Sequence, residues 1–88
     1  MSTKSKQQLP KWFKGELYKE GDTVKNPFSK EKYKLNNVEL SMYDFIIGSQ
    51  MVFEMAPKTV TKQKVIDFQK GLEWFRQQNA KAYMALLD

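Results

Sequence analysis

Four lysines close together in the first half of the chain are the strongest candidates for a binding site. The set consists of Lys25, Lys30, Lys32 and Lys34. Ammonium groups gathered on one surface bind phosphate oxygens and release counterions, so they predict nucleic acid as one candidate partner. Histidine and cysteine do not occur in the sequence, which removes the commonest general base, the commonest transition-metal ligand and thiolate chemistry. We therefore predict a binding protein rather than an enzyme, with no metal and no cofactor.

A β-hairpin is the element that would place these lysines side by side. Residues 26–29 have the composition of a type I turn, and the flanking residues alternate between apolar and polar. With this loop, Lys25 lies opposite Lys30 and Thr23 lies opposite Lys32, so one face carries all four lysines. Neighbouring aromatic rings could stack on unpaired bases, and they are Trp12, Phe13, Tyr18, Phe28 and Tyr33. The alternative is a solvated edge whose lysines prevent aggregation between strands, with the rings packed inward.

The positive charge of the chain is confined to its first part. Residues 1–35 contain nine lysines and four acidic residues, a net charge of +5. Residues 36–88 contain six basic and six acidic residues, so the charge of +5 on the whole chain comes from the front alone. Such asymmetry indicates what kind of partner the chain attracts and carries no information about the fold.

Helices are predicted for most of the remaining chain. Asn36 and Glu39 have the spacing of a capping box, which predicts a helix over about Asn37–Met55 that ends before the next proline. A second helix is expected over about Lys62–Gln78 and a short third one over Ala80–Leu87. The predicted fold class is α+β and mainly helical, with an N-terminal β-hairpin packed on two main helices and a short C-terminal helix.

The start of the chain is predicted to contribute little to the fold. Residues 1–10 are polar and basic, which favours a disordered leader, and residues 11–88 are expected to form one small domain. A short helix is predicted over Lys11–Glu20. The first residues lack the apolar run of a secretory signal, and no segment is apolar enough to span a bilayer. Together with the absence of cysteine, this favours a cytoplasmic protein that does not enter a membrane.

Three residues are candidates for a protein interface. Trp74 lies about 135° around the second helix from the middle of its apolar stripe, and Ile66 also falls outside that stripe. Tyr43 lies among the few polar residues of the first helix, which is otherwise apolar on nearly all sides. We therefore predict a non-enzymatic module that binds a protein partner, with a second copy of the chain as one candidate. The alternative for Trp74 is that the N-terminal segment or the last helix covers it.

The glycines and the carboxylates of the predicted helices do not indicate a ligand site or a catalytic site. Gly48 and Gly71 lie inside predicted helices, where close helix packing explains them better than a groove left for a ligand. Glu39 and Asp44 are five residues apart, which turns them about 140° from one another on a helix. They therefore do not form an acid–base pair.

Four stretches of the chain carry a resemblance to known proteins, and they are Trp12–Tyr18, Asn26–Ser29, Glu39–Phe45 and Tyr83–Asp88. These stretches resemble small accessory proteins encoded by marine bacteriophages, cyanophages especially. The resemblance implies a bacterial cytoplasm and an accessory role during infection. It implies no activity, and no functional residue is transferred from it.

Overall fold

A computed structural model of the chain describes residues 7–26 and 28–87. An antiparallel hairpin of two strands precedes three α-helices, and a 3-10 turn at Pro57–Thr59 joins the first two of them. The elements are β1 (Asp22–Lys25), β2 (Lys32–Leu35), α1 (Asn37–Met55), α2 (Lys62–Gln78) and α3 (Ala80–Leu86). The predicted fold class, α+β and mainly helical, is confirmed, and so are the bounds of the two long helices.

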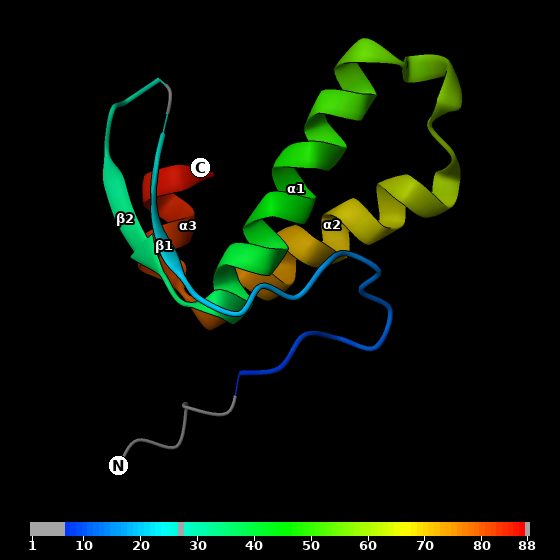
Figure 1. Cartoon of the computed structure of the whole chain (residues 1–88). Helices are drawn as coiled ribbons and strands as arrows, with labels where there is room; N and C mark the ends of the chain where they lie inside the picture. Colours follow the sequence, from blue (N-terminus) through cyan, green and yellow to red (C-terminus); the bar gives the residue numbers. More distant parts are fainter. Residues whose placement is uncertain (1–6, 27, 88) are drawn as a thin grey trace.

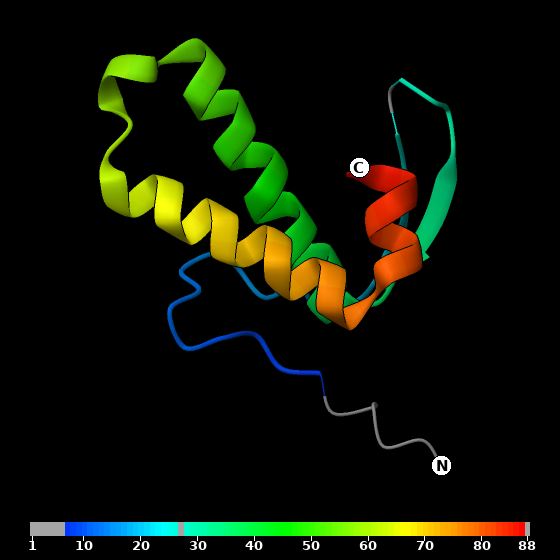
Figure 2. The same ribbon diagram turned by 180° about the vertical axis from the view of Figure 1, so that it is seen from behind.

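The three helices and the hairpin converge at one end of the molecule and diverge at the other. Figures 1 and 2 show α1 in the middle, with α2 on one side and α3 with the hairpin on the other. The core lies at the converged end, because there all of these elements contribute apolar side chains to one cluster. Its buried members are Leu35, Met42, Ile46, Phe75, Ala82 and Leu86. The diverging ends leave the second half of α1 with fewer neighbours.

The caps of α1 are those that the sequence predicts. The side chain of Asn36 accepts a hydrogen bond from the backbone N–H of Glu39 at 2.8 Å, and the Glu39 carboxylate accepts one from the Asn36 N–H at 3.1 Å. These two bonds satisfy amide groups that the first turn of a helix leaves free. The helix ends at Met55, two residues before a proline that cannot continue it.

The hairpin forms, but its register differs from the predicted one by two residues on β2. Lys25 pairs with Lys32, and Thr23 pairs with Lys34. The loop between Lys25 and Lys32 is longer than predicted. Within it, the backbone N–H of Asn26 donates a hydrogen bond to the Glu31 carbonyl at 2.8 Å. Lys30 lies within this loop with a positive φ of 69°. A shift of two residues keeps every side chain on its own face, so the alternating pattern fits both registers and only the loop distinguishes them.

The N-terminal segment is extended rather than helical. The helix predicted over Lys11–Glu20 is wrong, since this stretch has a single turn in which Phe13 N–H bonds to the Pro10 carbonyl at 3.0 Å. The rings of Trp12 and Phe13 lie 5.8 and 5.6 Å from the ring of Phe45 on α1. Packing on α1 thus outweighs the weak helical pattern. Residues 7–10, predicted to belong to the leader, also pack on the domain, whereas residues 1–6 lie outside the described part.

Candidate protein-binding surface

The second half of α1 presents three large apolar side chains to solvent. Met51, Val52 and Met55 are 54%, 41% and 78% exposed, and their spacing places them on one side of the helix. We call these three residues the α1 ridge. They remain exposed because α2 and the hairpin diverge from α1 at this end (Figure 1). Methionine side chains are flexible and polarisable, and they adapt to differently shaped partners.

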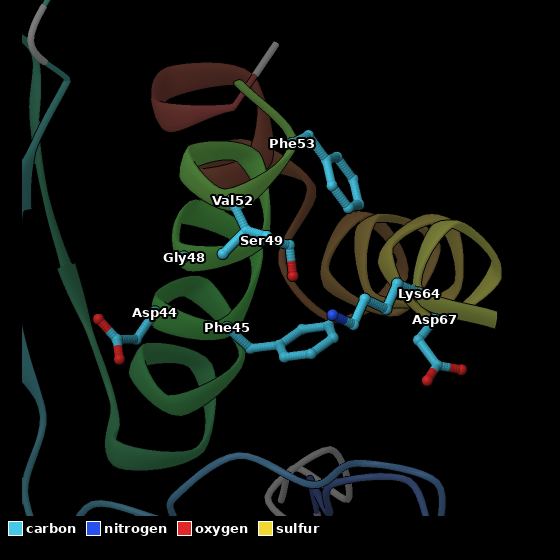
Figure 3. A pocket seen from close by; sticks show the side chains of 8 residues that line it. All are labelled: Asp44, Phe45, Gly48, Ser49, Val52, Phe53, Lys64 and Asp67. Atoms are coloured by element: carbon cyan, nitrogen blue, oxygen red, sulfur yellow. The ribbon is translucent and has the colours of Figure 1, made fainter. Parts of the chain in front are cut away.

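A first hollow lies on one side of the α1 ridge, between α1 and α2. Its volume is about 420 Å³. Figure 3 shows that the side chains of Phe45, Phe53 and Lys64 reach across the space between the two helices, whereas Asp44 points away from α2. Phe53 also contacts Phe68 of α2, with ring centres 5.2 Å apart. The lining residues are Asp44, Phe45, Gly48, Ser49, Val52, Phe53, Lys64 and Asp67.

The two helical glycines have different roles. A Cβ atom on Gly71 would lie 3.2 Å from the Met42 sulfur and 3.4 Å from the Phe45 ring, so the predicted close packing is confirmed there. A Cβ atom on Gly48 would meet nothing within 4 Å, and close packing is therefore the wrong explanation for this residue. Gly48 instead lines the first hollow, where the missing side chain leaves the backbone of α1 accessible.

A second hollow lies on the other side of the α1 ridge, between α1, α3 and the hairpin loop. Its volume is about 360 Å³. Phe28 of the loop is 92% exposed beside it, and Tyr43 of α1 packs against the buried Phe75 with ring centres 6.3 Å apart. Partial burial raises the pKa of Tyr43 above its ordinary value, because it disfavours the charged phenolate. The lining residues are Asn26, Phe28, Tyr43, Ile47, Gln50, Met51, Glu54, Leu86 and Leu87.

The α1 ridge and the two hollows form one continuous surface. Val52 of the ridge lines the first hollow and Met51 lines the second, so the ridge is their common border. The charged groups at the edge of the first hollow already form hydrogen bonds within the chain. Asp44 accepts a bond from the Tyr18 hydroxyl at 2.7 Å, which raises the pKa of Tyr18, and the Lys64 ammonium donates to the Thr59 carbonyl at 3.3 Å. The shape suits an elongated apolar ligand.

The structure does not bring the three predicted interface residues together. Trp74 is partly buried against the core, and its indole N–H donates to the Gln8 carbonyl at 3.2 Å. The N-terminal segment thus covers Trp74, as the alternative explanation required. Ile66 is exposed on α2 but is not among the residues that line either hollow. Only Tyr43 lies at the candidate surface.

Sequence reasoning missed the residues that dominate this surface. The apolar character of α1 on nearly all its sides indicated that part of the helix faces a partner, but not which part. The exposed side is decided by where α2 and α3 cross α1. The missed residues are Met51, Val52 and Met55, while Phe28 was singled out only as a ring that could stack on bases.

The predicted lysine face is present in a reduced form. Lys25, Lys32 and Lys34 are exposed and share the outer face of the hairpin, while Lys30 lies in the loop. Within residues 7–26 and 28–87, no acidic side chain forms an ion pair with them. Of the five rings predicted to accompany these lysines, only Phe28 is exposed, and it borders the second hollow. Stacking on several bases is therefore not supported.

A polar cluster around the buried carboxylate of Glu39 joins the beginnings of α1 and α3. The carboxylate of Glu39 accepts hydrogen bonds from the side chains of Gln7 at 3.1 Å and Asn79 at 3.0 Å, besides the Asn36 N–H. Asn79 in turn caps α3 by accepting a bond from the Ala82 N–H at 3.1 Å. Every polar group here has a partner inside the chain, which indicates a structural role.

Among the described residues, no three potential ligand side chains converge to hold a metal ion. No helix in that part of the chain combines the length and apolarity needed to cross a bilayer. Comparisons with protein-family models, curated proteins and solved structures found no match for this chain.

Proposed function

We propose that this protein is a non-enzymatic module that binds an amphipathic helix of a protein partner along the α1 ridge. The observation that carries the proposal is the exposure of Met51, Val52 and Met55 on one side of a helix with a hollow on each flank. Large apolar side chains grouped in this way are typical of a contact that the isolated chain leaves unfilled.

A helix fits this surface better than a loop does. Amphipathic helices dock into apolar grooves through anchor residues at helical spacing, and the two hollows could receive such anchors on either side of the ridge. The backbone of the partner could approach closely at Gly48, where a Cβ atom would find open space. Full burial contributes about 1.5–3 kcal/mol for each large apolar side chain, so the three ridge residues could offset a substantial part of the cost of association.

The test is the binding of a helical probe with a neutral polar face. A synthetic peptide of leucine and glutamine, patterned for an amphipathic helix of about 18 residues, should bind the intact chain in calorimetry. Met55→Glu should weaken this binding by about tenfold or more, because it places a charge on a surface that loses its water. Thermal unfolding of the variant should be nearly unchanged, since Met55 is exposed.

Met84→Glu provides the matched control. Met84 is an exposed methionine on α3, outside the α1 ridge, so the same substitution there should leave peptide binding unchanged. Equal losses in both variants, or no peptide binding at about millimolar concentration, would refute the proposal. Sedimentation equilibrium should show a monomer. A dimer that Met55→Glu dissociates would identify a second copy as the occupant and would overturn the proposal of a separate partner.

Nucleic-acid binding is the second candidate function, favoured by the direct pairing of Lys25 with Lys32. Like charges opposite one another on a hairpin are unfavourable, and a phosphate backbone would relieve the repulsion. Lys32→Gln should weaken binding to a mixed-sequence oligonucleotide and reduce the slope of log K against log salt by about 0.7–0.9. Lys70→Gln, which removes an exposed lysine of α2, should leave the slope unchanged. Binding that does not vary with salt would exclude this function.

The cellular setting is part of the proposal. The absence of cysteine favours a reducing compartment, and the resemblance to accessory proteins of marine bacteriophages favours a bacterial cytoplasm. A helical segment of a host protein or of another phage protein would then be the ligand of the α1 ridge. Fractionation of expressing bacterial cells should place the chain in the cytoplasmic fraction, and recovery with the membranes would contradict this setting.

A further inference from the structure

We infer that the helix bound by the α1 ridge is basic, with lysine or arginine residues on both sides of its apolar face. This inference rests on the proposed function and adds the charge of the partner to it. The inference is based on a difference in net charge. The side chains that line the two hollows have a negative net charge, whereas the net charge of the whole chain is positive.

The surface around the α1 ridge is acidic although the chain is basic. The residues that line the two hollows include three carboxylates, from Asp44, Glu54 and Asp67, and one ammonium group, from Lys64. Their formal net charge is −2, whereas the whole chain carries +5. The cations of the protein are therefore concentrated elsewhere, and the candidate surface is an anionic region within a cationic molecule.

The carboxylates lie on both flanks of the ridge. Glu54 borders the second hollow, while Asp44 and Asp67 border the first. The single opposing cation, Lys64, already donates to the Thr59 carbonyl. In addition, α1 contains no lysine and no arginine along its whole length. A docked helix with basic residues beside its apolar face would thus meet a carboxylate on either side.

The same charges argue against the other occupants of this surface. Two copies that met through their α1 ridges would bring Asp44 and Glu54 of one copy towards those of the other, and like charges in an interface oppose association. An acidic helix would suffer the same repulsion. For a basic helix the hairpin is repulsive and the ridge is attractive, so the field of the protein directs the ligand to the ridge.

Three peptides with the same apolar face test the charge of the ligand. Their polar flanks carry lysine, glutamine or glutamate, and their affinities for the intact chain are measured by calorimetry at low salt. We expect the lysine peptide to bind about fivefold more tightly than the glutamine peptide, and the glutamate peptide to bind more weakly by a similar factor. If the net charge of +5 on the whole chain decided the affinity, the glutamate peptide would bind most tightly. The two explanations therefore predict opposite orders of affinity for the three peptides.

Glu54→Lys should remove most of the preference for the lysine peptide over the glutamine peptide, because it replaces the carboxylate beside the second hollow with an ammonium group. Glu20→Lys makes the same change at an exposed residue that lines neither hollow, and the preference should remain. Equal binding of all three peptides would overturn the inference and leave the proposed function intact. Failure of the glutamine peptide to bind would instead refute the proposed function itself.

Discussion

Glu39→Ala is expected to lower the free energy of unfolding by about 3 kcal/mol, measured by urea denaturation. Glu39 is buried, and its carboxylate accepts hydrogen bonds from the backbone of Asn36 and from the side chains of Gln7 and Asn79. Alanine would leave these donors without an acceptor. The three hydrogen bonds are partly buried, and donors that lose a charged partner after leaving water for that bond carry a penalty of about 1–3 kcal/mol.

The effect is large because three separate segments meet at this carboxylate. Asn36 caps α1, Asn79 caps α3, and Gln7 belongs to the N-terminal segment that packs on the domain. Domains of this size have a total stability of roughly 4–13 kcal/mol, so the loss would be a substantial fraction of it. Glu39→Gln keeps one acceptor oxygen and the shape of the side chain, and it should cost clearly less. A loss below about 0.5 kcal/mol for Glu39→Ala would contradict this account.

Phe75→Ala is expected to lower the free energy of unfolding by about 4 kcal/mol, observed as an earlier midpoint in the same denaturation experiment. Phe75 is 0% exposed and is the largest fully buried side chain of the core. Truncation to alanine removes apolar contacts and leaves a cavity that the surrounding helices cannot fill by moving a short distance. The ring also supports Tyr43 at the second hollow, so peptide binding should weaken even under conditions in which the variant stays folded.

Phe28→Ala is the control for this prediction, because it removes the same ring from a site that is 92% exposed. We expect its unfolding free energy to change by less than about 0.5 kcal/mol. Its peptide affinity should nevertheless fall, since the ring borders the second hollow. The two phenylalanines therefore separate the contribution of an aromatic ring to the core from its contribution to the candidate surface. Similar stability losses in both variants would contradict the assignment of Phe75 to the core.

In the folded molecule, the lysines of the hairpin and the carboxylates beside the α1 ridge lie on different surfaces. The hairpin presents Lys25, Lys32 and Lys34 on one outer face, while the borders of the α1 ridge carry an excess of carboxylates. A protein with this distribution can hold a basic helix at one surface and a polyanion at another without the two ligands competing for the same groups. The two proposed functions are therefore compatible, and their tests are independent because no residue is changed in both.

Local patterns in the sequence were sufficient wherever the relevant interactions are local. The helix α1 could be predicted from Asn36 to Met55 because its capping box and its terminating proline act within a few residues of each helix end. The sequence pattern likewise predicted α2 and α3, whose N-caps in the structure are Thr61 and Asn79. The outward direction of the hairpin lysines also follows from simple alternation, since it does not depend on the register.

Contacts between residues far apart in the sequence decided the features that local patterns did not predict. The segment Lys11–Glu20 has a weak helical pattern, but contacts of Trp12 and Phe13 with a helix more than thirty residues away hold it extended. Trp74 is partly covered because the chain around Gln8, just before that segment, passes over it. Gly48 lines a hollow because α2 diverges from α1 beyond the crossing at Gly71. The sequence alone determined which helix has more apolar surface than the core requires. Only the tertiary structure decided which side of that helix stays exposed, because exposure depends on the angles at which the other helices cross it.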